Sequence, residues 1–231
     1  MNSIDPALSL IQYLVFLFST VCHEAAHALA AKWGGDPTAF LGGQVTLSPW
    51  PHIRREPFGM VLMPLLGLFT GTGLIGWASA PFDPYWSQRY PKRSAWMSLA
   101  GPVANFTLVV IAAICMRVGI FAGIFRFPDH LSLTHLVQPR GTGDLTDGVA
   151  VFLSILFSMN ILLGTFNLIP IPPLDGFSVL GLFLPENAAR KLAELRITIG
   201  AYAFIGLLLA WRIFGDVYWS VLGQSLRVLY F

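Results

Sequence analysis

Residues 7–33 read ALSLIQYLVFLFSTVCHEAAHALAAKW, and this stretch decides what kind of fold the chain can form. It is apolar over more than the ~20 residues that an α-helix needs to cross the hydrocarbon core of a bilayer. Its only acidic or histidine side chains are those of His23, Glu24 and His27. Ionisable side chains at membrane depth are costly and mark functional positions. The stretch therefore predicts a transmembrane helix that carries a polar site.

The composition of the whole chain also indicates a membrane protein. Of its 231 residues 55% are hydrophobic and only 11% are charged, whereas an ordinary soluble domain has roughly a quarter charged residues. The net charge of +2 argues against a nucleic-acid-binding protein, and the two cysteines lie in apolar runs, which excludes a disulfide-rich scaffold. We expect an all-α polytopic membrane protein.

Further apolar runs follow the first helix along the chain. Together with it they predict about four transmembrane helices in one integral-membrane domain, residues 1–231. The four predicted spans are residues 7–33, 94–125, 149–184 and 197–215. Residues 217–231 are amphipathic and suit an interfacial helix. Residues 44–47, which read QVTL, suit a short β element after the first helix.

The histidines of the first helix are spaced as in an H-E-x-x-H motif. Residues i and i+4 lie on one helical face, so the imidazoles of His23 and His27 can both reach one metal ion. Glu24 would then lie beside a water molecule at that metal. The ordinary alternative is a buried, satisfied polar cluster, which leaves three polar side chains in an apolar helix without a role. We predict a zinc site, which needs a third protein ligand.

Three sources of the third ligand can be compared. A further histidine downstream, as in the extended H-E-x-x-H-x-x-G-x-x-H pattern, is absent from this sequence. Glu56 is an acid beside two arginines in a polar loop, where a solvated charge is the better interpretation. Asp175 is the only other acid at membrane depth, and it follows Pro170, Pro172 and Pro173. Prolines so closely spaced break a helix.

Three motifs occur along the chain, HEAAH, AGPVANF and NLIPIPPLDG, at residues 23–27, 100–106 and 167–176. In this order they resemble the site-2 protease family of intramembrane zinc metallopeptidases. The GWA at residues 76–78 and the LSP…H at residues 47–52 are similar to a compact bacterial branch without a PDZ or CBS domain. The resemblance covers most of the chain.

The resemblance implies a function and a set of site residues. The implied function is a zinc metalloendopeptidase, with one zinc ion per chain, that cleaves membrane-anchored proteins in or near their transmembrane segments. Glu24 would be its general base. By resemblance the zinc ligands would be His23, His27 and Asp175.

Three other polar residues are candidates for contacting the substrate or the oxyanion. Asn105 and Asn167 lie in the second and third motifs, and hydrogen bonds between helices are the competing interpretation for both. His52 could face the substrate or support the site, and a solvated loop histidine is its ordinary alternative.

Residues 58–81 are apolar but rich in glycine and proline, and the zinc site predicts how they run. If they span the bilayer, Asp175 emerges on the far side from the histidines, because it lies 26 residues into the run that begins at Val149 and a helix rises ~1.5 Å per residue. If they form a re-entrant segment, Asp175 arrives at the level of the histidines. Irregular backbone at membrane depth is tolerated where protein surrounds it. We therefore expect a re-entrant segment.

The re-entrant arrangement also separates the charges. Three cations, Arg126, Arg140 and Arg227, lie on the side of the termini. Nine lie on the other side: Lys32, Arg54, Arg55, Arg89, Lys92, Arg93, Arg190, Lys191 and Arg196. The positive-inside rule makes the second side cytoplasmic. We expect a protein of the bacterial inner membrane, with both termini outside and the active site toward the cytoplasm.

A metal-binding transporter and a catalytically silent binding module are the rival functions. Transporters usually contain repeats with paired broken helices, whereas one proline-broken helix with an acid is present here. A silent zinc site has no need of a base such as Glu24. The expected partners are a membrane-anchored protein substrate and the lipid bilayer, with no nucleic acid, and the sequence defines no oligomeric state.

Overall fold

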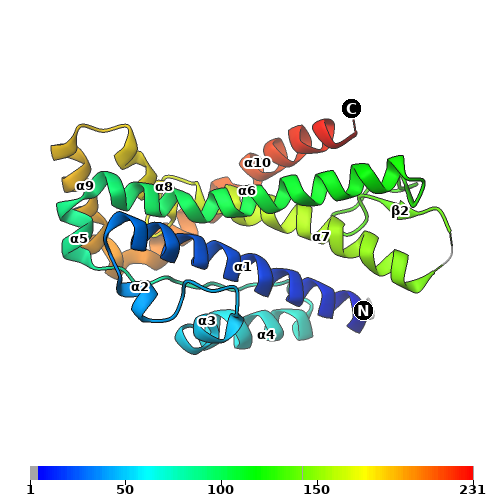
Figure 1. Ribbon diagram of the computed structural model, residues 1–231, viewed down its shortest axis with the longest axis horizontal. Coiled ribbons are helices and arrows are strands. Elements are labelled where there is room, and N and C mark those ends of the chain that lie inside the picture. Colours follow the sequence, from blue (N-terminus) through cyan, green and yellow to red (C-terminus); the bar gives the residue numbers. More distant parts are fainter. Residues whose placement is uncertain (1–4, 142, 231) are drawn as a thin grey trace.

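Long apolar helices make up most of the computed structural model, which describes residues 5–141 and 143–230 (Figure 1). Within these residues four helices are long and apolar enough to cross a membrane. They are α1 (Pro6–Gly34), α6 (Pro91–Phe121), α7 (Asp144–Asn167) and α10 (Ala203–Tyr230). The prediction of an all-α polytopic membrane protein with about four transmembrane helices is confirmed.

Local sequence sets both ends of α1. The Asp5 side chain accepts hydrogen bonds from the backbone N–H groups of Ala7 and Leu8, and Pro6 occupies the first turn, where its missing N–H costs nothing. The helix ends at Gly35, whose φ of 97° is a left-handed conformation that glycine adopts without a Cβ penalty. The 29-residue helix thereby holds the H-E-x-x-H motif in its C-terminal half.

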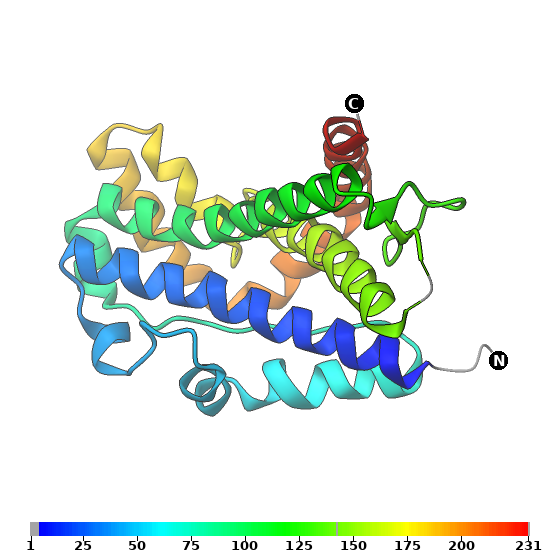
Figure 2. The same ribbon diagram turned by 45° about the vertical axis from the view of Figure 1, so that its right-hand side comes forward.

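Helices α1, α6 and α7 pack against one another and form the centre of the molecule (Figures 1 and 2). Large side chains such as Phe157 and Met116 are completely buried there. The outward faces of the long helices carry exposed apolar side chains instead, among them Ile114 of α6 and Leu208 of α10. An apolar outer surface of this extent suits contact with lipid rather than water.

The segment 58–81 doubles back on itself. It begins as a π-helix (Phe58–Leu62), continues as α4 (Met63–Thr70), and turns at Gly71 with a φ of 70°. The chain then returns in an extended form along α4, between it and α1 (Figure 2). The backbone N–H of Trp77 donates to the carbonyl of Gly59 over 3.1 Å, so the two arms are in contact. This is the path that a re-entrant segment would take, and entry from the cytoplasmic side stays a prediction.

The predicted β element at residues 44–47 is wrong. Gln44 has no regular structure, and residues 45–47 form bends between α2 (Thr38–Leu41) and α3 (Pro49–Arg55). The N–H of Gln44 donates to the carbonyl of Ala39, so the chain is still turning off α2 and has no strand beside it to pair with. The short antiparallel pair of the structure lies between α6 and α7, where β1 (Phe125–Arg126) pairs with β2 (Gln138–Pro139).

The predicted span at residues 149–184 is shorter as a helix and begins earlier. Helix α7 ends at Asn167, because the prolines that follow cannot donate to a helical ladder. The chain then reverses so tightly that a Cβ on Gly176 would collide with the carbonyl of Leu168. It continues as α8 (Asp175–Val179) and a 3₁₀ turn (Leu180–Leu182).

The last helix is one element where the sequence predicted two. Helix α9 (Glu186–Thr198) and a 3₁₀ turn (Ile199–Tyr202) precede α10, which runs unbroken to Tyr230. The predicted boundary near residue 216 is absent because no proline interrupts the ladder there; residue 231 lies outside the described residues.

Arg117, a cation in the apolar α6, has its partner at the end of α10. Its guanidinium Nη1 donates to the carbonyl of Leu229 over 2.8 Å. The last carbonyls of a helix lack partners within the helix and carry partial negative charge, so a cation is favourable there.

The elements richest in basic residues lie at one end of the long axis (Figure 1). Helices α3, α5 (Pro84–Arg89), α9 and the start of α6 lie toward that end, on the left in Figure 1, and the pair β1–β2 lies toward the other. The end with the basic side chains is also the C-terminal end of α1, which is the half of that helix that carries the histidines.

Candidate metal centre

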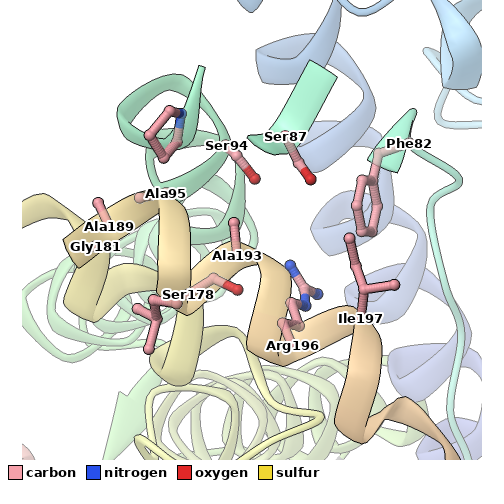
Figure 3. Close-up of a pocket in the computed structure, with 12 residues that line it drawn as sticks. Phe82, Ser87, Ser94, Ala95, Ser178, Gly181, Ala189, Ala193, Arg196 and Ile197 are labelled. Atoms are coloured by element: carbon pink, nitrogen blue, oxygen red, sulfur yellow. The ribbon is translucent and has the colours of Figure 1, made fainter. Parts of the chain in front are cut away.

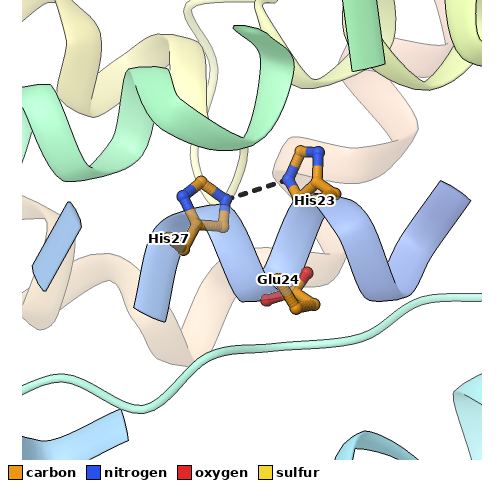
Figure 4. A group of neighbouring side chains, drawn as sticks. All are labelled: His23, Glu24 and His27. Carbon is orange, nitrogen blue, oxygen red and sulfur yellow. Dashed lines mark hydrogen bonds between the residues drawn. The ribbon is translucent and has the colours of Figure 1, made fainter. Parts of the chain in front are cut away.

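Two helices bring three buried side chains together. His23 and His27 come from α1, and Asp175 is the first residue of α8. The two Nε2 atoms are 2.9 Å apart, and Oδ2 of Asp175 is 3.1 Å from each of them. The exposed fractions are 6% for each histidine and 8% for Asp175. Figure 4 shows both imidazoles on the side of α1 that faces α6.

The hydrogen bonds at the other ring nitrogens determine where the imidazole protons lie. Nδ1 of His27 is 2.7 Å from the carbonyl oxygen of Met97, and Nδ1 of His23 is 2.6 Å from Oδ1 of Asn105. A carbonyl oxygen only accepts, so each Nδ1 carries a proton and donates it. A ring that is neutral and donates from Nδ1 presents the lone pair of Nε2 to the shared space.

With both rings neutral, three electron-rich atoms face one another. Two Nε2 lone pairs and a carboxylate oxygen at about 3 Å separation repel unless a cation, either a metal ion or a proton, lies between them. Zinc takes such nitrogen and oxygen ligands at ~2.0–2.2 Å, which places neighbouring ligands of a tetrahedral site roughly 3.3 Å apart. The separations of 2.9–3.1 Å are close to that value, so the residues fit the ion that the sequence predicts.

A glycine of α6 leaves room for that ion. A Cβ built on Gly101 would lie 2.5 Å from Nε2 of His23 and closer still to Nε2 of His27. Real Cβ atoms do not approach other atoms so closely, so any side chain at this position would enter the space between the imidazoles.

The carboxylate of Glu24 lies near the two imidazoles but does not point into the space that they share with Asp175. One of its carboxylate oxygens and one nitrogen of each histidine lie within 4.8 Å of one another, and Glu24 is 5% exposed. Figure 4 shows its carboxylate on another side of α1, facing the extended chain that follows α4. Asp175 contacts both imidazoles at 3.1 Å, so its carboxylate, rather than that of Glu24, adjoins both Nε2 atoms.

Of the other predicted candidates, Asn105 contacts this cluster, and the remaining three have hydrogen-bond partners elsewhere. Asn105 contacts His23 but is completely buried, so it faces no open surface. Asn167 ends α7 and donates through Nδ2 to the carbonyl of Leu163. His52 is buried in α3, with Nε2 3.2 Å from the carbonyl of Thr46. Glu56, the acid weighed as a third ligand, accepts a 2.5 Å hydrogen bond from Ser79 in the returning chain instead.

Sequence reasoning misplaced one cation, Arg196. It counted Arg196 among the cytoplasmic charges, but this side chain points inward from α9 (Figure 3). Its Nη1 donates to Ser98 over 3.3 Å, and its guanidinium lies 5.1 Å from the Phe82 ring. With Ser87, Ser94 and Ser178 it lines a small cavity of about 10 Å³, which suits one water molecule.

Comparisons with known proteins agree with the motifs. The model of peptidase family M50 matches residues 11–211 of this chain. The "Putative zinc metalloprotease YwhC" of Bacillus subtilis is 32% identical over 201 residues, which cover 86% of this chain and 79% of that protein. The "Putative zinc metalloprotease Rip2" of Mycobacterium tuberculosis is 31% identical over 208 residues, which cover 88% of this chain and 70% of that protein.

No solved structure matches this chain. The region that the family model matches contains the H-E-x-x-H motif, the glycine that faces it and the aspartate that completes the cluster. The resemblance drawn from the three motifs is thereby confirmed, and the chain belongs to peptidase family M50.

Proposed function

We propose that this chain is a zinc-dependent endopeptidase that cleaves membrane-anchored proteins in or near their transmembrane segments. The observation that carries the proposal is the cluster of His23, His27 and Asp175, buried beside Glu24 within the bundle of apolar helices. The names of the two relatives, both of which read "Putative zinc metalloprotease", support zinc as the metal.

The chain's own residues would perform the proton transfers of peptide hydrolysis. His23, His27 and Asp175 would hold the zinc ion, which when bound polarises a carbonyl and acidifies water. Glu24 would accept a proton from the attacking water and deliver it to the leaving amine, so one carboxylate serves as base and then as acid. Burial of the cluster keeps bulk water away and strengthens each of these charge interactions.

A transmembrane substrate must unwind before its backbone can be attacked, because a helix occupies its own carbonyl groups. Two irregular segments of this chain border the site. The proline-broken segment at residues 168–174 leads directly into Asp175, and the extended chain after α4 passes on the side of Glu24 (Figure 4). We propose that an unwound substrate segment lies between them.

Cleavage by purified protein is the direct test of this function. We expect the protein, in nanodiscs, to cut a model transmembrane substrate within its apolar segment, as located by mass spectrometry of the products. A chelator should abolish cleavage, and one equivalent of zinc per chain should restore it. Cleavage that persists without metal would contradict the proposal. So would zinc transport into sealed vesicles without any cleavage, which is the result expected of a transporter.

The protein is an integral membrane protein, and we further propose that its cytoplasmic side is the end where the basic side chains gather. Asn187, on α9, and Ser132, between β1 and β2, are exposed at opposite ends of the molecule. In a variant without native cysteines, we expect a membrane-impermeant maleimide to label Ser132→Cys on intact spheroplasts. Asn187→Cys should react only after lysis. The reverse pattern would place the termini and the active site on the opposite sides.

A further inference from the structure

A set of completely buried polar side chains lies beyond the metal centre, between the three central helices. Ser19 of α1, Asn105 of α6 and Asn160 of α7 each have an exposed fraction of 0%. Burying polar groups at membrane depth is costly unless they are hydrogen-bonded. Apolar side chains would fill the same space at less cost, so the presence of this set calls for an explanation beyond packing.

Hydrogen bonds join these side chains into one chain that ends at the metal centre. Nδ2 of Asn160 is 2.8 Å from Oγ of Ser19 and also 2.8 Å from the carbonyl oxygen of Leu156. Oδ1 of Asn160 is 2.8 Å from Nδ2 of Asn105. Oδ1 of Asn105 is 2.6 Å from Nδ1 of His23. We call these four side chains, Ser19, Asn160, Asn105 and His23, the amide relay.

The direction of every bond in the relay follows from one backbone group. The Leu156 carbonyl can only accept, so the atom of Asn160 next to it must be the NH₂ group. The oxygen of Asn160 then faces Asn105, which must present its own NH₂ group. The oxygen of Asn105 is left to face His23, where it accepts from Nδ1–H and leaves the Nε2 lone pair for a metal.

His27 needs no relay. Its Nδ1 donates directly to the backbone carbonyl of Met97, and a carbonyl oxygen can only accept a hydrogen bond. His23 faces a side-chain amide instead, and an amide can rotate so that either its oxygen or its nitrogen points at the ring. If the nitrogen of Asn105 faced the ring, the proton would move to Nε2 and block the metal.

We propose that Asn160 and Ser19 are positioning residues for metal binding, which hold the Asn105 amide in the one orientation that lets His23 bind zinc. Neither residue touches the metal-binding atoms, so both act through Asn105. The inference rests on the proposed zinc site, but its test measures metal affinity and therefore does not depend on peptide cleavage.

The first measurement is zinc affinity, by competition with a chromophoric chelator. Asn160→Leu has nearly the same shape but offers no acceptor to Asn105, and we expect it to weaken zinc binding about tenfold. Asn160→Asp, as a neutral carboxylic acid, can donate to Leu156 and still offers an oxygen to Asn105, so it should retain most of the affinity. The absorption spectrum of bound Co²⁺ should change in Asn160→Leu, because the orientation of His23 at the metal changes.

Ser154→Ala is the matched control. Ser154 is also completely buried on α7 and hydrogen-bonded, to Leu136 and Ala150, but it has no link to His23. Its loss should lower stability without changing zinc affinity. Ser19→Ala, which removes a single acceptor, extends the test if Asn160→Leu does not accumulate in the membrane. We expect about a twofold loss for Ser19→Ala, because Leu156 still orients the amide.

A double variant separates positioning from general packing. If Asn160 acts only through Asn105, then Asn160→Leu should have no further effect on affinity once Asn105→Leu is present. Additive losses, or equal zinc affinity in all of these variants, would overturn the inference. A wild-type protein that binds zinc and cleaves no transmembrane substrate would refute the proposed function and leave the relay standing.

Discussion

Replacing Glu24 with glutamine is expected to lower kcat for cleavage of a transmembrane substrate by about 10²–10⁴-fold, the range that general acid–base catalysis contributes. Glutamine has the shape of glutamate but cannot take a proton from water at neutral pH. Zinc content should stay near one ion per chain, because Asp175 rather than Glu24 lies 3.1 Å from both Nε2 atoms. Cleavage kinetics and metal analysis of the same purified sample measure the two effects.

The matched control for Glu24 is a second glutamate that the structure keeps away from the site. Glu56→Gln should cleave within a few fold of the wild type, because the amide oxygen of glutamine can still accept the hydrogen bond from Ser79 in the returning chain. If Glu24→Gln cleaves at the wild-type rate, Glu24 is not the base. If it loses zinc, Glu24 is itself a ligand, and the assignment of Asp175 as third ligand is wrong.

Replacing Gly101 with alanine is expected to abolish zinc binding and, with it, cleavage. The new methyl group would lie about where the two imidazoles converge, 2.5 Å from Nε2 of His23. The loss of affinity should exceed the roughly 10–100-fold that removal of an outer hydrogen-bond partner costs, because the methyl group excludes the metal itself. Equilibrium dialysis with zinc measures this loss directly.

A second glycine of the same helix provides the control for Gly101. A Cβ on Gly119 would collide with the ring of Phe125, far along α6 from the histidines. Gly119→Ala should therefore destabilise the protein by overpacking while zinc affinity stays at the wild-type value. Normal zinc binding by Gly101→Ala would mean that the imidazoles do not hold the metal in this arrangement.

Two sequence-based interpretations failed for a shared physical reason. Residues 44–47 have strand-like side chains, but a strand forms only where another strand lies beside it, and here the neighbour is the end of α2. The last helix has polar residues near position 216, yet a helix ends where its backbone ladder is interrupted, and nothing interrupts it before Tyr230. In both cases side-chain character alone was a poor guide to backbone pairing.

The path of residues 58–81 shows how far sequence reasoning could reach. Its glycines and Pro64 predicted irregular backbone, and the level required of Asp175 predicted a return to the starting side. The contact between Trp77 and Gly59 agrees with that return. That prediction rests on helix rise and the reach of a metal ligand, two quantities that do not depend on side-chain packing, and re-entry at the bilayer stays a prediction.

The sequence by itself determined those features of the protein that depend only on the local geometry of a helix. It placed four long apolar helices, and it put His23 and His27 on one face of the first, because hydrogen bonds within the helix fix the angle between residues i and i+4. Only the tertiary structure decided which distant groups meet them. Asp175 is 152 residues from His23 and Asn105 is 82 residues from it. Contacts of that kind depend on how helices pack in register, to within a fraction of an ångström, and no local pattern encodes that register.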